Sequence, residues 1–131
     1  MINYNELARA AIIARRAAYA PYSRFYVGAA ILAMDGRIFT GCNVENAAYG
    51  GTICDERTAV CKAVSEGYRK FKKIAIWGNC DDYCFPCGAC RQFMSEFSYD
   101  MQVISANSKG EYHSCSLKEL MPFAFNTENL K

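Results

Sequence analysis

The spacing of apolar and polar positions along the 131-residue chain predicts alternating short helices and strands. Residues 4–18 carry apolar side chains at helical intervals with arginines between them, which predicts an amphipathic helix. Asn3 or Asn5 is placed to cap its start, and the Ala-Pro-Tyr-Ser run at 20–23 is expected to end it. This helix must bury one face against another element of the fold.

Two further apolar runs, 27–34 and 37–44, lie on either side of Asp35-Gly36. An Asp-Gly pair between two such runs favours a two-residue turn, so the pattern predicts a β-hairpin. The other predicted elements are a helix from Cys54 to Ser65, a strand at 73–77, a helix at 88–97, strands at 101–105 and 112–115, and a short helix after Ser116.

Ser116 and Glu119 have the spacing of a capping box, in which each side chain bonds the other residue's backbone N–H. Five strands with helices before, between and after them predict an α/β fold. We expect a three-layer α/β/α sandwich, in which a five-stranded sheet carries helices on both faces. No linker or internal repeat divides the chain, so residues 1–131 are expected to form a single domain.

Charge and hydropathy exclude several classes of partner. The chain has 15 basic and 13 acidic residues, a net charge of +2, and no basic cluster, so nothing favours binding to nucleic acid. No apolar run is long enough to span a membrane, and no basic start followed by an apolar stretch suggests a signal peptide. We therefore expect a soluble, cytoplasmic protein.

Cysteine is the unusual residue, because the chain has eight and four of them lie between positions 80 and 90. In a reducing compartment, clustered cysteines favour a metal site over disulfides. Within this cluster, Cys80 and Cys84 are expected to be free loop thiols. Outside the candidate motifs, three cysteines are expected to be small buried apolar residues: Cys42, Cys61 and Cys115.

Two predicted helix starts carry the candidate metal ligands. Cys54 begins one helix, and Cys87 and Cys90 lie three residues apart at the start of another, where both sulfurs share a face. Helix N-termini stabilise thiolates, and three protein ligands with a fourth position left to water are typical of catalytic zinc. Three thiolates make such a centre net negative, and Arg57 is placed on the face of Cys54 to offset that charge.

Glu56 follows Cys54 by two positions. In a regular helix it would point about 200° away from the cysteine, but the irregular first turn lets it reach toward a water on the metal. A carboxylate that lies beside the metal without ligating it is the group that a hydrolytic proton shuttle needs.

The motif Cys54-Asp55-Glu56-Arg57, followed by Pro86-Cys87-Gly88-Ala89-Cys90-Arg91-Gln92, resembles the signature of the zinc-dependent cytidine deaminases. A cysteine at the first ligand position is similar to the small, homotetrameric branch of that family, which acts on free nucleosides. The likeness extends over almost the whole chain, through segments that stand in the family's order: 20–25, 27–30, 41–49 and 119–122.

The resemblance implies hydrolysis of cytidine, and of 2′-deoxycytidine, to the uridine nucleoside and ammonia in pyrimidine salvage, on a fold whose sheet is mixed. It implies one Zn²⁺ per chain, held by Cys54, Cys87 and Cys90. Glu56 would move protons from the attacking water to the pyrimidine N3 and to the leaving amine.

The resemblance also implies how a nucleoside is held. Asn43 and Glu45 would hydrogen-bond the ribose hydroxyls, and Phe25 would pack on the pyrimidine. Tyr49 and Phe125 would contact the site of a neighbouring subunit in a homotetramer. The implied substrate-binding residues are Phe25, Asn43, Val44, Glu45 and Asp55, the last through its backbone.

Two positions depart from the family pattern. Asp55 stands where the family usually has alanine, and its side chain would add negative charge beside an anionic metal centre. Cys84 forms a second Cys-x-x-Cys with Cys87. A structural zinc with Cys84 as the fourth ligand therefore stays open, as does an iron–sulfur cluster on the four cysteines between 80 and 90.

Simpler roles also remain open for the other candidates. Glu56 could be a surface acid that the helix dipole favours in a first turn, and Asn43 and Glu45 could lie at an exposed strand end. Phe25 and Phe125 could be ordinary core residues. At the level of function, the alternatives are deamination of another aminopyrimidine and a non-catalytic, zinc-stabilised binding module.

Overall fold

The computed structural model describes residues 2–130, with side chains from residue 6 onward. Asn3 and Asn5, the predicted helix caps, have side chains outside the described part. The elements in chain order are α1 (Ile2–Arg15), β1 (Val27–Ala33), β2 (Ile38–Cys42), the 3₁₀ turn η1 (Tyr49–Gly51), α2 (Asp55–Ser65), β3 (Phe71–Gly78), α3 (Gly88–Ser95), β4 (Gln102–Ala106), β5 (Tyr112–Ser116), α4 (Leu117–Leu120) and the 3₁₀ turn η2 (Thr127–Leu130).

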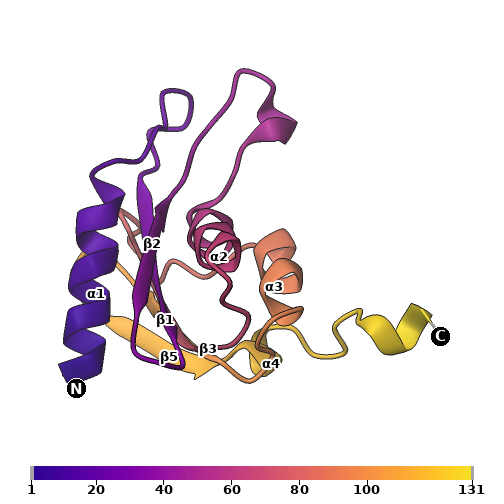
Figure 1. Cartoon of the computed structure of the whole chain (residues 1–131). Helices are drawn as coiled ribbons and strands as arrows, with labels where there is room; N and C mark the ends of the chain where they lie inside the picture. Colours follow the sequence, from indigo (N-terminus) through magenta and orange to yellow (C-terminus); the bar gives the residue numbers. More distant parts are fainter. Residues whose placement is uncertain (1, 131) are drawn as a thin grey trace.

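Within residues 2–130 the strands form one five-stranded sheet in the order β2-β1-β3-β4-β5 (Figure 1). β3 and β4 run parallel, and every other neighbouring pair is antiparallel. The parallel pair needs a crossover, and the segment that contains α3 supplies it. The predicted five-stranded mixed sheet is therefore confirmed.

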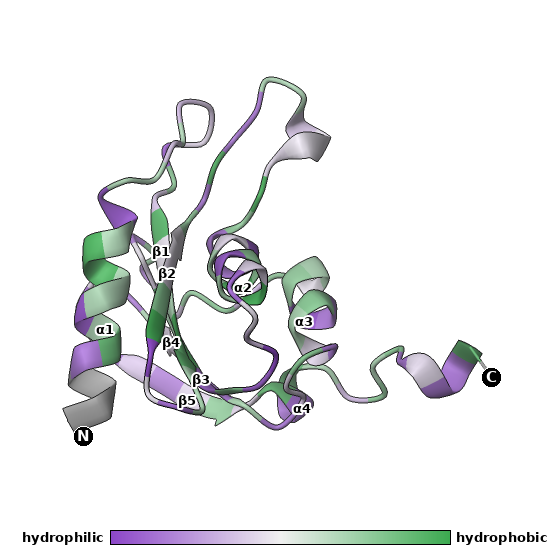
Figure 2. Ribbon diagram, in the orientation of Figure 1, coloured by the Kyte–Doolittle hydropathy of each residue, from purple (hydrophilic) through white to green (hydrophobic). Residues whose placement is uncertain are grey.

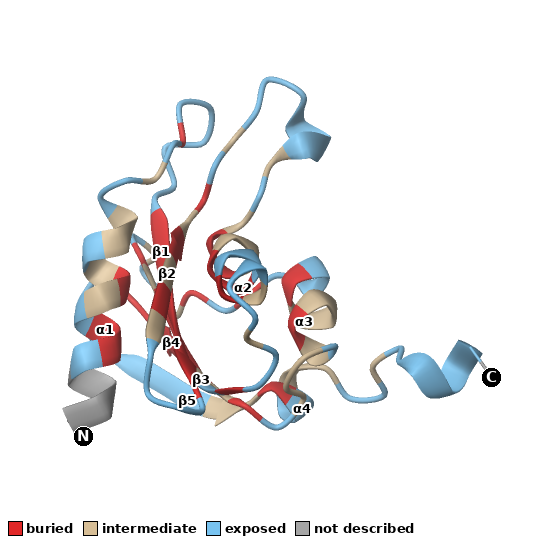
Figure 3. Cartoon of the chain, in the orientation of Figure 1, coloured by how far each residue is buried: buried red, intermediate tan, exposed pale blue. Residues whose placement is uncertain are grey.

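The sheet is buried on both faces. α1 covers one face, where Leu7 and Ala11 pack on apolar residues of β1 and β3. α2 and α3 cover the other face and bury Val60 and Met94 in the larger apolar cluster. Hydrophobic residues follow the central strands (Figure 2), and these strands are the most buried part of the chain (Figure 3). The expected α/β sandwich with helices on both faces is confirmed.

The hairpin forms as predicted, but its turn is longer than two residues. β1 and β2 pair through Leu32 and Ile38, and Ala33 N donates to Arg37 O at 2.9 Å. Gly36 has a φ of +94°, a left-handed conformation that glycine adopts without a steric penalty. The glycine therefore marks the turn correctly, while the strands end one residue short of the predicted two-residue loop.

α1 ends at Arg15, several residues before the predicted stop. Its last turn tightens, because Ala18 N donates to Arg15 O in a three-residue step. Tyr19 then pairs with the chain beyond β2, donating from its N to Asn43 O at 2.9 Å. The helical pattern of the sequence is thus overridden by strand-like pairing between distant segments.

The short C-terminal helix is built as its sequence predicts. Ser116 Oγ accepts a hydrogen bond from Glu119 N at 3.2 Å, and Glu119 Oε1 accepts one from Ser116 N at 2.9 Å. This reciprocal pair is the predicted capping box, and it turns the chain from the edge strand β5 directly into α4.

Two glycines let the helices approach the sheet closely. A Cβ on Gly41 of β2 would collide with Asp55 O and Ala59 N of α2, and a Cβ on Gly28 of β1 would collide with Ala11 O of α1. Glycine at position 41 therefore sets how deep the start of α2 lies against the sheet.

Among the segments that project from the sandwich (Figure 1) are the loop 43–54, which carries η1, and the tail after α4, which carries η2. Both are largely exposed (Figure 3). Among the described residues, none of the helices has the length and apolarity that a membrane crossing requires.

Candidate active site

The starts of two helices bring three cysteine sulfurs together. Cys54 is the N-cap of α2, Cys87 is the N-cap of α3, and Cys90 lies in the first turn of α3. Cys54 Sγ is 3.8 Å from Cys87 Sγ, and Cys87 Sγ is 3.3 Å from Cys90 Sγ. All three sulfurs lie within 4.8 Å of one another, and this is a group in residues 6–130 that could hold a metal ion.

The donor set fits zinc. Neither N-cap cysteine uses its side chain to cap its own helix, so both sulfurs are available as ligands. Three thiolates at tetrahedral Zn²⁺ leave one position for water, which is the arrangement of catalytic rather than structural zinc. The structure thus brings together the three predicted ligands, Cys54, Cys87 and Cys90.

Arg57 lies where the sequence predicts it, next to the sulfur of Cys54. Its Nη2 is 3.5 Å from Cys54 Sγ and also donates to Thr52 O at 3.3 Å. A hydrogen bond from Cys90 contributes most to lowering the pKa of Cys54, to about 5, and the Arg57 hydrogen bond adds to this effect. The same contact, together with burial, raises the pKa of Cys90 above its ordinary value.

Glu56 is buried beside these thiols, with 3 % of its surface exposed. The interpretation of Glu56 as a surface acid is therefore wrong, because the close approach of α2 to the sheet buries Asp55 and Glu56 at the start of the helix. Burial raises the pKa of the Glu56 carboxyl, and the nearby Cys54 and Cys87 add to that effect. A raised pKa makes the carboxylate a better proton acceptor than an ordinary surface glutamate.

Asp55 is also buried, and its Oδ2 has no hydrogen-bond partner within the described part of the chain. Burial, followed by the charge of Glu56, raises the pKa of the Asp55 carboxyl well above its usual range. The sequence predicts an added negative charge here, and burial of the side chain opposes that charge. Desolvation of the carboxyl accounts for this difference.

A cavity of about 220 Å³ opens over the thiols. Phe25, which precedes β1, lines this cavity together with Glu56 and Cys54. Phe25 is partly exposed there and is not a core residue. Other lining residues come from the loop between β3 and α3, which we call the wall loop (residues 79–86): Cys80, Tyr83, Cys84 and Phe85.

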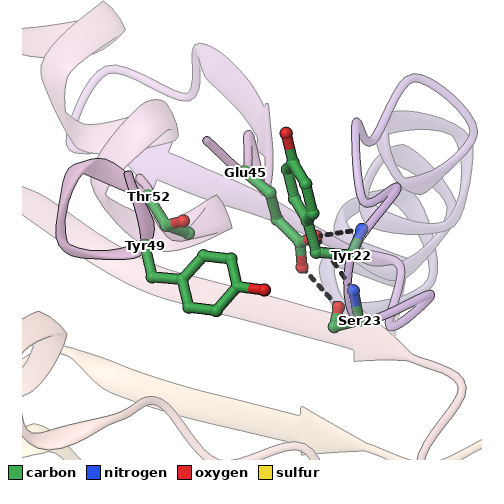
Figure 4. Close-up of a pocket in the computed structure, with 5 residues that line it drawn as sticks. All are labelled: Tyr22, Ser23, Glu45, Tyr49 and Thr52. Atoms are coloured by element: carbon green, nitrogen blue, oxygen red, sulfur yellow. Dashed lines mark hydrogen bonds between the residues drawn. The ribbon is translucent and has the colours of Figure 1, made fainter. Parts of the chain in front are cut away.

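Glu45 lines a different pocket, of about 240 Å³, together with Tyr22, Ser23, Tyr49 and Thr52 (Figure 4). Tyr22 and Tyr49 face each other there, with ring centroids 5.7 Å apart. Each of the two pockets is smaller than the roughly 300–1,000 Å³ of typical small-molecule sites. Of the predicted nucleoside-binding residues, Phe25 and Asp55 line the cavity over the thiols, Glu45 lines this second pocket, and Asn43 and Val44 line neither.

Glu45 holds the segment that leads to Phe25. Its Oε1 accepts hydrogen bonds from Tyr22 N at 3.0 Å and Ser23 N at 3.1 Å, and its Oε2 accepts one from the Ser23 hydroxyl (Figure 4). The Ser23 hydroxyl is the main cause that lowers the pKa of the Glu45 carboxyl below its ordinary range.

Asn43 holds the same segment from its other end. Its Nδ2 donates to Phe25 O at 2.7 Å, and its Oδ1 accepts from Val27 N at 3.0 Å. Asn43 is only 7 % exposed, so its interpretation as an exposed strand end is wrong. These two bonds leave one N–H and one lone pair of the amide unused. Val44, between the two polar residues, pairs through its backbone with Tyr19 and Ile53 and exposes its side chain.

Cys80 and Cys84 form a disulfide with a Cα–Cα distance of 6.0 Å, so their prediction as free thiols is wrong. The wall loop folds back on the β4–β5 turn, where Cys84 N donates to Ala106 O and Ser108 N donates to Cys80 O. These long-range bonds bring the two cysteines together, and no local sequence signal predicts them. Because Cys84 is disulfide-bonded, it is not available as the fourth ligand of a structural zinc. The same bond argues against an iron–sulfur cluster held by the four cysteines between 80 and 90.

The other free cysteines are less buried than predicted. Cys61 is exposed on α2, and Cys42 and Cys115 are partly buried. Tyr49 and Phe125, the predicted contacts to a neighbouring subunit, lie on the two projecting segments and are exposed by 75 % and 57 %. Tyr83 and Phe85 of the wall loop line the cavity but were not among the predicted site residues, although two aromatic residues beside a cysteine motif are a usable signal.

Comparisons with known proteins agree with this geometry. The family model for the cytidine and deoxycytidylate deaminase zinc-binding region matches residues 1–106. A cytidine deaminase of Sporosarcina psychrophila is 50% identical over 118 residues, covering 89% of this chain and 87% of the relative. One from Halalkalibacterium halodurans is 47% identical over 125 residues, covering 95% of each chain.

A solved structure shows the same fold. The crystal structure of the cytidine deaminase from Burkholderia pseudomallei superposes with a TM-score of 0.91 at 46% identity. The match covers 93% of this chain and 98% of that one. The family model, the relatives and the thiol cluster lead to one conclusion: the chain belongs to the cytidine and deoxycytidylate deaminase family.

Proposed function

We propose that the protein hydrolyses cytidine to uridine and ammonia, and that 2′-deoxycytidine is also a substrate. One observation carries the proposal, which is the buried Glu56 carboxyl in the wall of the same cavity as the cysteine sulfurs. Hydrolysis at a ring carbon needs a proton shuttle beside an activated water, and no surface role explains a carboxyl buried at this place.

In this proposal Glu56 carries the proton transfers. It accepts one proton from the attacking water and passes it to the pyrimidine N3, then takes the second proton from the same oxygen, now bound to C4, and passes it to the leaving amine. The water oxygen adds at C4, the bond from C4 to the amino nitrogen breaks, and ammonia departs. Burial of Glu56 keeps the carboxyl away from bulk solvent, so that its protons pass to the substrate.

We assign one zinc ion per chain to Cys54, Cys87 and Cys90. Zn²⁺, when bound, acidifies a coordinated water and acts as a Lewis acid. Arg57 partly neutralises the three thiolates, which would otherwise make the centre strongly anionic. The dipoles of α2 and α3 act in the same direction, because both helices point their N-termini at the sulfurs.

We assign the nucleoside to both hollows of the site. Phe25 packs on the pyrimidine above Glu56, the backbone at Asp55 reads the base, and Asn43 and Glu45 bind the ribose. The remaining N–H of Asn43 and the acceptor oxygens of Glu45 support this assignment. Val44 contributes its backbone position between these two residues.

The test is the ultraviolet absorbance of zinc-loaded protein mixed with cytidine, since deamination shifts and lowers the pyrimidine band. Glu56→Gln keeps the shape of the side chain and should lose at least about 10²-fold in kcat, the usual contribution of a positioned acid–base group. Glu96→Gln, an exposed site at the end of α3, is the matched control and should behave as wild type. Full activity in Glu56→Gln with zinc bound would contradict the mechanism.

We further propose that the chain acts as a single domain within a homotetramer and serves cytoplasmic pyrimidine salvage. Tyr49 and Phe125 would reach the site of a neighbouring subunit, and their exposure on projecting segments supports this role. Sedimentation of the wild type and of Tyr49→Ala at matched concentrations tests the assembly. A monomeric, fully active wild type would refute it.

A further inference from the structure

The wall loop contains a disulfide next to the candidate active site, and neither the zinc ligands nor the proposed chemistry uses it. Cys80 and Cys84 join across residues 81–83. Both cysteines line the cavity that Glu56 and Phe25 also line. A covalent link in the wall of a substrate cavity can alter the shape and order of that wall without touching the reacting groups.

The wall loop contains no helix or strand, and backbone hydrogen bonds hold it at its two cysteines. Cys84 N donates to Ala106 O at 2.9 Å, and Ser108 N donates to Cys80 O at 2.9 Å. Between the two cysteines and just beyond them, Tyr83 and Phe85 pack against the ring of His113, with ring centroids 5.9 and 5.4 Å away. The disulfide is the covalent part of this small assembly.

The two sulfurs differ in accessibility. Cys84 is buried, and its Sγ lies so close to Gly78 that a Cβ on this glycine would be 2.8 Å away. Cys80 is only half-buried and lines the cavity. A thiol from solution can therefore reach Cys80 before Cys84.

We propose that Cys80–Cys84 is a thiol–disulfide exchange site for a cellular thiol reductant, and that its oxidation state sets the affinity of the cavity for the nucleoside. The inference rests on the proposed function for the identity of the substrate. In the oxidised protein the wall loop is ordered and the cavity is preformed. Reduction removes the cross-link, so the wall must be ordered when the substrate binds.

Reduction of the Cys80–Cys84 disulfide consumes two thiols of the reductant. A thiolate attacks Cys80 Sγ, the bond to Cys84 breaks, and Cys84 leaves as a thiolate that takes up a proton. A second thiolate attacks the mixed disulfide, which releases Cys80 and forms the disulfide of the reductant. Two electrons pass from the reductant to the protein.

Reduction of the disulfide should not affect the proton transfers at Glu56. Glu56 and Cys54 lie on α2, which is not part of the wall loop. Between the disulfide and Cys87 stands Pro86, which is fully buried and whose carbonyl accepts a 2.7 Å hydrogen bond from Arg91 Nε. The oxidation state should therefore act on KM and leave kcat nearly unchanged.

The experiment equilibrates zinc-loaded protein in glutathione buffers of graded reduction potential. Alkylation and mass spectrometry then map the free thiols, and cytidine kinetics are measured at each potential. We expect KM to rise about tenfold on reduction, the affinity lost when a binding wall must be ordered. The zinc content should stay constant, and kcat should change by less than about twofold, because a pure binding effect leaves kcat unchanged.

Two variants sharpen the result. Cys80→Ser keeps the buried Cys84 and should show the KM of the reduced wild type at every potential. Cys61→Ser removes an exposed thiol on α2, away from the cavity, and should keep the full redox response. A Cys80→Ser variant with the KM of the oxidised wild type would overturn the proposal.

Other outcomes are also decisive. The proposal would be overturned if protein purified under air had free thiols at 80 and 84. It would also be overturned if KM did not change when the disulfide is reduced. Zinc loss in step with reduction would overturn it as well, because the metal ligands would then be the redox-sensitive groups. No turnover in any oxidation state would contradict the proposed function alone, and cytidine binding by equilibrium dialysis at each potential would then decide the redox proposal.

Discussion

Arg57 donates a 3.5 Å hydrogen bond to the sulfur of Cys54, from one turn further along the same helix. Its other contact, to Thr52 O, ties the guanidinium to the loop that enters α2. A positive charge is thus fixed beside a predicted thiolate ligand by two independent anchors. Positions that hold a metal ligand in this way usually affect the chemistry as well as the fold.

Arg57→Gln should lower kcat about 10- to 100-fold near neutral pH, the range typical of residues that support metal ligands. Without the cation, the thiolate centre is more negative, so a water bound there should be less acidic. The kcat of the variant should therefore recover as pH rises, which a pH profile would show. Arg9→Gln, an exposed residue of α1 on the opposite face of the sheet, should match wild type.

Glu45 should make substrate binding sensitive to acid. Its pKa is lowered by the Ser23 hydroxyl and by two backbone N–H groups, so its stabilising hydrogen bonds are complete above the ordinary carboxylate range. They are lost as pH falls through the lowered pKa, when the carboxyl takes up a proton. KM of wild type should rise in that acidic range, whereas Glu45→Gln should have a raised KM that changes little with acid. Parallel profiles for both proteins would count against this role.

Asn43→Ala should destabilise the fold as well as weaken binding. It leaves Phe25 O and Val27 N without their partner in a largely buried place, and each unsatisfied group costs about 1–3 kcal/mol. Asn43→Asp keeps an acceptor for Val27 N but loses the donor to Phe25 O, so it should fall between Ala and wild type. Denaturant unfolding measures the order, and equal stability of all three proteins would show that the bridge contributes nothing.

Removal of zinc should loosen the helical layer of α2 and α3. The three ligands come from both helices, so metal binding links them and stabilises the folded state by mass action. A strong chelator should abolish turnover, lower Tm and expose Cys54, Cys87 and Cys90 to alkylation. Added Zn²⁺ should restore all three properties. A Tm that is insensitive to the chelator, with zinc demonstrably removed, would exclude the structural part of this prediction.

Local patterns predicted the parts of the fold that depend on local physics. The Asp35-Gly36 pair located the hairpin, and the Ser116–Glu119 spacing located the capping box, because both features are complete within a few residues. The Cys-x-x-Cys at 87–90 predicted two convergent sulfurs for the same reason. Helix geometry alone fixes such short-range relationships.

Contacts between segments that are distant in the sequence could not be predicted from local patterns. α1 stops early because Tyr19 pairs with Asn43, and the amide of Asn43 serves the backbone as well as a possible ligand. The Cys80–Cys84 bridge depends on hydrogen bonds to the β4–β5 turn. In each case a tertiary contact decides between local options that the sequence leaves equal.

The missing side chain at Gly41 has a consequence for how this protein can vary. The hydrogen atom at that position lets the first turn of α2 lie where Cys54 and Glu56 reach the cavity. A selection for turnover among random variants should accept many replacements at exposed Cys61, on the same helix, and none at Gly41. The position most intolerant of change would then be one that never meets the substrate and lies beneath the catalytic helix.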